Sequence, residues 1–429
     1  MTDIFSSIPD VINREYSEYE IKKDIAMRRY DNLSYDDYLA QCKAIENQGF
    51  ILYDENIIKD NHHRTYIKEF FLHIYFVETE KTLRIVVDKV SEKYATSQED
   101  CENIYHSVLW QYEVDHSLID CGMCYIIRCC DGSFFVIDSA HMLSSFDNIR
   151  IIKFLRQLNN GEKPLVSGWY FSHSHDDHVA KFLDILDYNR DEIDIECIYY
   201  NFPPVTHRDN DCWGENTRRM TTRFEETVIK HPDIKKVILH TGQRFFVRNL
   251  EFVVLCTHED VFPNSLEDYN NSSTALMMTA NRSKVLFPGD CSDESDKILV
   301  GRYGDYLKTD IVQISHHGHQ GTSCEFYRLA AAKCALFPIT QIKFDEELPK
   351  QKPNRLAIEL AEEYHIASNG TAQIPLPYKS GQTKIFPDET FEDFYAIYEL
   401  WKYDYTTEYK QKLYEEFLKR RSLPKPECL

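Results

Sequence analysis

Five side chains of metal-binding type lie within six consecutive positions of this sequence. They follow an aromatic residue and a serine in the segment Phe-Ser-His-Ser-His-Asp-Asp-His, and they are His173, His175, Asp176, Asp177 and His178. Neutral imidazole nitrogens and carboxylate oxygens are ligands of divalent zinc, manganese and iron. A polar loop that is rich in histidine by chance is the alternative interpretation. The combination of His-x-His with Asp-His disfavours it, so the segment predicts a metal site.

The flanking residues predict how this cluster is held. The apolar run over residues 164–171 is expected to form a buried strand that ends at the cluster. Val179, Phe182 and Leu183 have the spacing of the buried side of a helix that starts just after it. A tight loop between a strand and a helix directs several side chains toward one point.

Three further strand ends carry side chains of the same kind. Residues 133–138 end in Asp138, and residues 284–287 are followed by Pro-Gly and Asp290. A carboxylate at Asp290 could bridge two cations. Another apolar run, residues 310–314, is followed by Ser-His-His-Gly. Each feature is weak alone, because Gly-Asp after a strand is most often a turn and His-His-Gly can be an ordinary loop.

In chain order, these segments resemble the five motifs of the metallo-β-lactamase superfamily of metal-dependent hydrolases. The order is Asp138, the cluster over residues 173–178, Asp290, and then the pair His316 and His317. The resemblance covers residues 120–378. Three details are similar to the hydrolase domain of late-competence DNA-uptake proteins and to phosphorylcholine esterases. They are Asn270-Asn-Ser-Ser273, Phe287-Pro-Gly-Asp290 and Ser315-His-His-Gly318.

The resemblance implies an α/β fold, a four-layer αβ/βα sandwich with the site at one edge of two packed sheets. It also implies two divalent metal ions, with zinc as the first expectation and manganese or iron as alternatives. The implied ligands are His173 and His175 for the first ion, Asp177, His178 and His317 for the second, and Asp290 between them.

The resemblance assigns roles to residues around the ions as well. His317 would be the ligand and His316 would face the substrate as a proton donor or phosphate contact, although the two could be exchanged. Asp177 would orient the attacking water in addition to binding metal. Asp138 would orient ligands from behind.

One position departs from the superfamily pattern. Many members place a further histidine before the position of Asp290, and this chain has Asn270 and Asn271 there. His258, near a strand end, is the nearby alternative ligand, and otherwise a residue of the rim. The first ion is therefore expected to be more open to water and substrate. The two asparagines and Ser273 are candidates for contacts to substrate.

These residues predict a metal-dependent hydrolase of a phosphodiester or related phosphoester. Two cations close together lower the pKa of a bridging water, so hydroxide exists near neutral pH, and they stabilise charge that develops on ester oxygens. A lactone or thioester hydrolase would use the same groups. A non-catalytic metal-binding regulatory module is a third interpretation. The set Asp177, Asp290 and His317 argues against it, because a structural site does not need a bridging carboxylate.

The overall composition limits the partners. The chain of 429 residues has 70 acidic and 49 basic side chains, a formal charge of −21. This balance disfavours nucleic acid, which normally meets a basic surface, and favours a small-molecule or headgroup phosphoester. The 13 cysteines are odd in number and scattered, as in free thiols of a reducing cytosol. No signal-peptide pattern or membrane-spanning run is present in the sequence, so we expect a cytoplasmic protein.

Residues 1–100 are expected to form an N-terminal extension with a small α+β module. Ser34 has the pattern of a helix cap, and residues 66–88 that of a two-stranded hairpin. Residues 1–32 are interpreted as a short helical arm or a poorly ordered end. His73, within the hairpin, is interpreted as a packed strand residue rather than a ligand.

The rest of the chain is divided into two parts. Residues 101–387 are expected to form the hydrolase domain. Residues 388–429 are aromatic, with alternating charge, and predict a helical tail that caps the core or forms a contact in a homo-oligomer.

Overall fold

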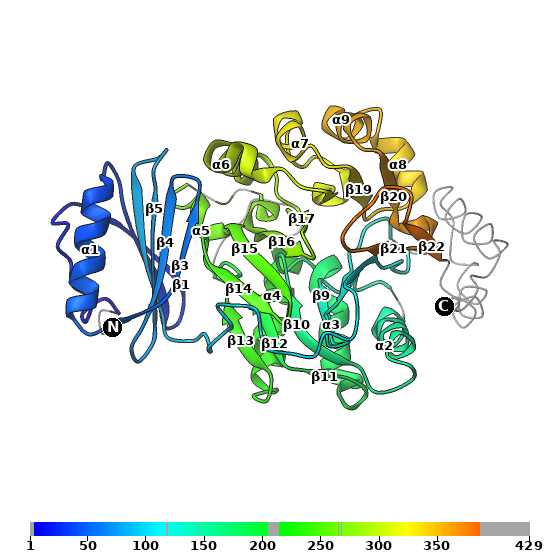
Figure 1. Cartoon of the computed structure of the whole chain (residues 1–429), viewed down its shortest axis with the longest axis horizontal. Coiled ribbons are helices and arrows are strands. Elements are labelled where there is room, and N and C mark those ends of the chain that lie inside the picture. Colours follow the sequence, from blue (N-terminus) through cyan, green and yellow to red (C-terminus); the bar gives the residue numbers. More distant parts are fainter. Residues whose placement is uncertain are drawn as a thin grey trace.

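Three β-sheets organise the computed structural model, which describes residues 4–116, 119–144, 146–204, 214–264, 266 and 268–386. Figure 1 shows an N-terminal sheet at one end of the molecule and the two other sheets, with their helices, beside it. The helical tail predicted over residues 388–429 lies outside the described residues. None of the described helices combines the length and the apolar character needed to cross a bilayer.

The N-terminal sheet has six strands in the order β1-β2-β6-β5-β4-β3. They are β1 (Ser17–Lys22), β2 (Ile25–Tyr30), β3 (Ile51–Ile58), β4 (Asn61–Ile67), β5 (Phe71–Val77) and β6 (Thr82–Asp88). Helix α1 (Tyr35–Asn47) covers one face of this sheet (Figure 1). It begins at Ser34, which forms a capping box with Asp37, so the predicted helix start is confirmed.

Two expectations for this region are wrong. Residues 1–32 contain the antiparallel pair β1–β2 rather than a helical arm, because Ile21, Ile25 and Met27 alternate into the core. The hairpin within residues 66–88 exists, but its first strand starts at Phe71. The residues before it belong to β4, which is a separate neighbour of β5. The division of the chain near residue 100 stays a prediction.

Strands β5 and β6 are buried on both faces. Because successive side chains alternate, Leu72, Ile74 and Phe76 pack in the cluster under α1. The intervening His73 points toward the sandwich, where its ring centroid lies 4.4 Å from that of His240. The second face of this sheet is thus an interface with the rest of the chain.

The nine-stranded sheet has the order β13-β12-β10-β9-β8-β7-β21-β22, with β11 beside β10. Its strands are β7 (Val108–Gln111), β8 (Tyr125–Arg128), β9 (Phe134–Ile137), β10 (Leu165–Tyr170), β11 (Asp194–Ile195), β12 (Cys197–Tyr200), β13 (Lys235–Ile238), β21 (Thr371–Pro375) and β22 (Lys384–Phe386). Its outer face packs against α2 (Asp147–Leu158), α3 (Asp176–Tyr188) and α4 (Gly214–Ile229).

The seven-stranded sheet has its strands in chain order, from β14 to β20. They are β14 (Arg244–Val247), β15 (Leu250–Cys256), β16 (Ala275–Ala280), β17 (Ser283–Phe287), β18 (Ile311–Gln313), β19 (Cys334–Phe337) and β20 (Glu363–Ile366). Its outer side carries α6 (Asp293–Tyr303), α7 (Cys324–Ala330), α8 (Gln341–Glu347) and α9 (Lys352–Leu360), which lie along one side of the molecule in Figure 1.

Aromatic side chains join the inner faces of these two sheets. The ring centroids of Phe135 and Phe252 are 4.3 Å apart, and those of Tyr199 and Phe245 are 4.7 Å apart. One continuous apolar cluster contains residues of both sheets. Helices outside each sheet complete the four layers, so the predicted αβ/βα sandwich is confirmed.

Candidate metal centre

The predicted ligands lie in the loops that follow β10, β17 and β18. Strands β9 and β10 are parallel, as are β17 and β18, so each pair ends at one edge of its sheet. His173 and His175 follow β10, and His175 directly precedes α3. Asp290 follows β17, and His317 lies in a short 3-10 turn after β18 (Ser315–Gly318). The packing of the two sheets brings these loops together.

Four buried side chains converge at this edge: Asp177, His178, Asp290 and His317. Nε2 of His317 lies 3.0 Å from Asp177 Oδ2, 3.2 Å from His178 Nε2 and 3.4 Å from Asp290 Oδ2. Nε2 of His178 lies 3.3 Å from the same oxygen of Asp290. Ligands that are about 2.0–2.2 Å from a tetrahedral zinc are roughly 3.3–3.5 Å from one another. The spacing of these four atoms therefore fits a single divalent ion.

Both histidines of this group make a hydrogen bond through Nδ1, which fixes the orientation of the ring. His178 donates from Nδ1 to Asp138 Oδ2 at 2.8 Å, and Asp138 Oδ1 accepts from the backbone N–H of Ser172 at 2.9 Å. His317 donates from Nδ1 to the carbonyl oxygen of Pro338 at 2.8 Å. A proton on Nδ1 leaves the lone pair of Nε2 available to a metal. Asp138 thus occupies the place that the resemblance implied.

The electrostatics of the group favour a cation. Burial opposes a charge on His317, but the carboxylates of Asp290 and Asp177 raise its pKa to about 10. Burial likewise opposes a charge on His178, and the surrounding carboxylates raise its pKa well above the usual value. Burial would raise the pKa of Asp290, but His317 and His178 hold it well below the usual range. The carboxylates therefore favour protonated histidines beside them. A bound divalent ion would supply this positive charge instead, and the histidines would release their protons.

The first predicted ion has fewer ligands. His173 Nε2 lies 2.9 Å from His175 Nδ1 and 3.9 Å from Asp290 Oδ2. Burial and the neighbouring His178 and His175 lower the pKa of His173 well below the usual value, so its ring is neutral. Among the described residues, Oδ1 of Asp290 is buried without a hydrogen-bond partner. That oxygen is free to bind an ion, while the oxygen of Asp290 nearest to His173 is Oδ2.

No further histidine completes the first group in the described part of the chain. His173 and His175 do not form, with another His, Cys, Asp or Glu, a set of three whose ligand atoms lie within 4.8 Å of one another. The ring of Tyr269 lies beside His175 instead, with centroids 5.2 Å apart. The expectation of a more open first ion stays a prediction.

The pair His316 and His317 is separated by its backbone. Both residues have left-handed φ, 49° and 54°, and their ring centroids are 6.4 Å apart. His317 reaches the convergent group, whereas Nδ1 of His316 donates to the carbonyl oxygen of Gln320 and its Nε2 accepts from Asn270 Nδ2 at 3.3 Å. Left-handed non-glycine residues cost free energy and cluster at functional sites. The role of His316 in catalysis stays a prediction.

Two predicted substrate contacts support the site from within the protein. Asn271 Oδ1 accepts from the backbone N–H groups of Glu294 and Ser295, at 3.1 and 3.0 Å, and so fixes the start of α6. Ser273 Oγ accepts from the backbone N–H of Asp290 at 3.0 Å. Together they hold the segment that runs from Asp290 to the start of α6.

His258 lies outside the convergent group. It is the first residue of the short helix α5 (His258–Val261), two residues past the end of β15. Its Nε2 donates to Asn201 Oδ1 at 2.9 Å, and its Nδ1 accepts from the hydroxyl of Tyr19 at 3.1 Å. His258 is thus not a member of the buried His/Asp group found among the described residues. Asp176, the remaining acidic residue of the motif, accepts from Asn216 Nδ2 at 2.8 Å.

Two positioning residues were not predicted. Gln313, in β18, accepts from the backbone N–H of Gly289 and donates to its carbonyl oxygen, each at 2.9 Å. Ser172 Oγ donates to Asp138 Oδ2 at 2.8 Å. A glutamine inside an otherwise apolar strand is the one sequence signal that points to such a role.

A hollow of about 710 Å³ lies beside His316. Its lining includes Asp268, Asn270, Asn271, Asp293 and Glu294. No lysine or arginine is among its described lining residues. The hollow therefore has an acidic wall.

The chain is similar to proteins of the metallo-β-lactamase fold. One is YhfI from Bacillus subtilis, at 12% identity and TM-score 0.38 over 60% of this chain and 96% of that one. Others are a diphosphatase of the PhnP family, at 14% identity and TM-score 0.32 over 55% and 86%, and a long form RNase Z from yeast, at 8% and 0.40 over 67% and 51%. This chain spans about half of the yeast protein. No protein-family model and no curated protein matches the chain.

Proposed function

We propose that this chain is a metal-dependent hydrolase of a phosphoester, with a phosphodiester as the favoured substrate and two zinc ions as the favoured metals. The observation that carries the proposal is the convergence of Asp177, His178, Asp290 and His317, with ligand atoms at the spacing of a shared ion. A structural site would not need Asp290 to keep a second, unpaired buried oxygen. In this proposal, that oxygen binds the first ion, which lies beside His173.

Each residue of the site has a distinct task in this proposal. Two divalent ions, when bound, neutralise charge on ester oxygens and lower the pKa of a coordinated water. Asp138 and Ser172 hold the ring of His178, and Ser273 and Gln313 hold the loop of Asp290. Asp177 would orient the attacking water in addition to binding an ion.

In this proposal the doubly protonated ring of His316 donates its Nε2 proton to the leaving oxygen. Its ring is partly exposed, and it lines the hollow next to His317. The hydrogen bond between Nδ1 and Gln320 fixes the ring orientation, so Nε2 faces Asn270 and the hollow. A proton donor at this position can reach the leaving oxygen of a substrate that is bound in the hollow.

The acidic wall of the hollow favours a substrate with a cationic part. Asp268, Asp293 and Glu294 would repel the further phosphates of a nucleic acid, and they would attract an ammonium or similar group. The Asn-Asn-Ser-Ser and Ser-His-His-Gly segments are similar to both the phosphorylcholine esterases and the DNA-uptake proteins. The acidic charge of the hollow is what favours a substrate like that of the esterases. We therefore favour a small molecule or a headgroup as the substrate.

A lactone or thioester hydrolase is the second candidate, because it would use the same ligands. Activity on bis-p-nitrophenyl phosphate without activity on a simple lactone supports the first proposal. The reverse pattern supports the second.

Metal analysis of the purified protein, followed by a panel of esters, tests the proposal. Asp290→Ala should lose turnover and the metal of this centre, so its metal content per chain should fall below that of the wild type, whereas Asp305→Ala, an exposed aspartate paired with Lys59, should keep both. Undiminished turnover in Asp290→Ala would overturn the dinuclear mechanism. Metal bound at this centre, lost in Asp290→Ala, without turnover on any ester class would instead support a regulatory module.

A further inference from the structure

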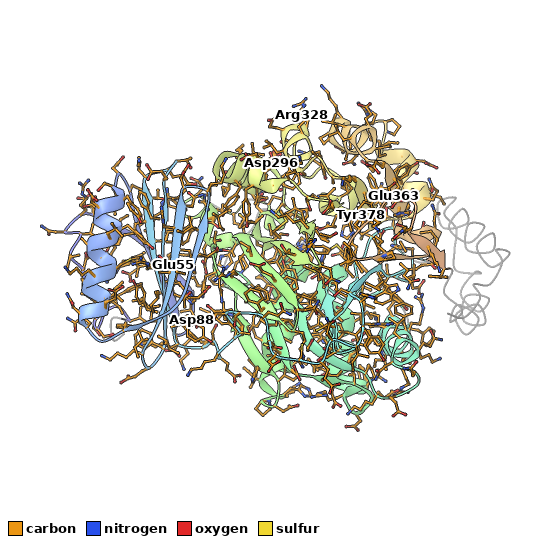
Figure 2. All side chains as sticks on the ribbon, viewed as in Figure 1. Glu55, Asp88, Asp296, Arg328, Glu363 and Tyr378 are labelled. Atoms are coloured by element: carbon orange, nitrogen blue, oxygen red, sulfur yellow. The ribbon has the colours of Figure 1, made fainter. Side chains whose placement is uncertain are left out.

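We propose that a third metal site, of the zinc class, joins the N-terminal sheet to the sandwich through His73, Asp88 and His240. One ligand atom from each of the three residues lies within 4.8 Å of the other two. Their exposed fractions are 1%, 0% and 0%. His73 lies in β5 and Asp88 ends β6, whereas His240 follows β13 of the nine-stranded sheet. Figure 2 labels Asp88 on the N-terminal sheet, beside the sandwich.

Both histidines are oriented as metal ligands are. Nδ1 of His240 lies 2.7 Å from Oε1 of Glu259, a carboxylate that accepts its proton. Nδ1 of His73 lies 3.0 Å from Oγ1 of Thr65. The carboxylate fixes the proton of His240 on Nδ1 and leaves its Nε2 as the coordinating atom, and the hydroxyl of Thr65 can accept a proton from Nδ1 of His73 in the same way. Metal sites commonly orient their histidine ligands through such hydrogen bonds. Here the partners are the carboxylate of Glu259 and the hydroxyl of Thr65.

The three residues keep ligand atoms for an ion. Nε2 of His73 is buried without a hydrogen-bond partner among the described residues. Nε2 of His240 lies 3.3 Å from Oδ2 of Asp88. The other oxygen of Asp88 accepts from the backbone N–H groups of Val90 and Ser91. Two imidazole nitrogens and one carboxylate oxygen are therefore available to one ion, a donor set that zinc accepts.

An ion pair alone would account for only part of this cluster. A protonated His240 between Asp88 and Glu259 satisfies those three side chains but leaves Nε2 of His73 unpaired in the interior. The adjacent His63 also has both ring nitrogens buried without a partner among the described residues, and its ring centroid lies 6.0 Å from that of His73. A divalent ion uses His73 and His240 together, and a water or His63 can take its fourth position.

The proposed ion has a structural role. Its ligands come from both sides of one interface and are fully buried, as in the closed sites of structural zinc. The candidate metal centre, in contrast, includes His317, whose chain neighbour His316 lines the hollow. The further site therefore fixes the N-terminal sheet to the sandwich and does not depend on the proposed hydrolase activity.

Zinc content per chain, measured on protein purified without chelators, tests this inference. His73→Gln should contain one zinc fewer than the wild type. His62→Gln is the matched control, since His62 lies in the same sheet and packs on Tyr35 of α1 with ring centroids 4.4 Å apart. It should keep the wild-type content. Equal zinc in His73→Gln, His62→Gln and the wild type would overturn the proposal.

Thr65→Val decides the question if His73→Gln does not fold. This variant keeps all three ligands and removes only the hydroxyl behind His73. It should release one zinc to a chelator at about 10–100-fold lower chelator concentration than the wild type. Zinc release that matches the wild type would show that the cluster is an ion pair without metal.

Discussion

Asp138 and His178 form a buried pair in which Nδ1 of the histidine donates to Oδ2 of the aspartate at 2.8 Å. Asp138 follows β9 with a left-handed φ of 55°, a conformation that costs free energy in a non-glycine residue. The backbone N–H and the hydroxyl of Ser172 both donate to the same carboxylate. Three hydrogen bonds therefore fix the aspartate in a strained position, from which it sets the ring of His178.

Replacement of Asp138 by asparagine should weaken metal binding without removing a ligand. The amide can no longer accept both from Ser172 and from His178 with two charged oxygens, so the ring of His178 loses its fixed orientation. We expect affinity for zinc to fall by about 10–100-fold, measured by competition with a chromophoric chelator. Asp131→Asn is the control, because Asp131 lies in the β8–β9 turn and pairs with Arg248. Wild-type affinity in Asp138→Asn would contradict this assignment.

A glycine before the bridging carboxylate should be intolerant of a methyl group. Gly289 has φ of 61°, and a Cβ there would lie 2.9 Å from Cβ of Ser172 and 3.1 Å from Cβ of Ser273. We expect Gly289→Ala to lower stability by about 1–3 kcal/mol. It should also weaken metal binding, because both neighbours position ligands.

Gly301→Ala is the matched control for this substitution. Gly301 lies within α6, and a Cβ there would meet no atom within 4 Å. The change should raise stability by about 0.5–1 kcal/mol, since alanine is the better helix former. Urea unfolding of the two variants measures both effects. A Gly289→Ala protein as stable as Gly301→Ala would show that the loop of Asp290 can move.

The sequence predicted the features that depend on neighbours along the chain. Ser34 and Asp37 are three residues apart, and they do cap α1. The order of motifs predicted the ligands that converge after β10, β17 and β18, because parallel strand ends meet at one edge of a sheet. Strand β1 was missed, since its short sequence is largely polar and its burial depends on pairing with β2.

Contacts between distant residues could not be predicted from the pattern. His73 and His240 are far apart in sequence, and they meet only because the N-terminal sheet packs on the sandwich. Asn271 was expected at the substrate and does line the hollow, but its hydrogen bonds to the start of α6 could not be predicted. Charged or polar residues inside a doubly buried strand, such as His73 and Arg84, were the signal that a polar interface lay beyond it.

His316→Gln should reduce turnover most for substrates whose leaving oxygen needs a proton. Loss of a general acid typically costs about 10²–10⁴-fold in rate. The loss should be large for an alkyl phosphodiester and small for a p-nitrophenyl ester, whose leaving group needs no proton. Zinc content should not change, because Nε2 of His316 faces Asn270 rather than the convergent group. An equal loss on both esters, or loss of zinc, would show that His316 is not the acid.

Asp260 should make the stability of the protein sensitive to acid. It lies in α5, where its Oδ1 is 2.6 Å from Nη1 of Arg302 and 3.8 Å from Nη1 of Arg84, and all three side chains are buried. Burial would raise the pKa of Asp260, but Arg302 and Arg84 hold it well below the usual value. A carboxyl with a lowered pKa stabilises the fold above its unfolded pKa of about 3.9, and this contribution is lost as the pH falls below that value.

Asp260→Asn should therefore destabilise the protein most at neutral pH. The change leaves two buried guanidinium groups without their central carboxylate, which costs about 3–5 kcal/mol. Urea unfolding at pH 7 and near pH 3.5 measures the free energy of unfolding of the wild type and of Asp260→Asn. The difference between them should be smaller near pH 3.5, because Asp260 there begins to take up a proton during unfolding. Asp305→Asn, at an exposed position, should follow the wild type at both values. A gap between Asp260→Asn and wild type that does not change with pH would mean that the arginines depend on packing and on Glu80 rather than on the charge of Asp260.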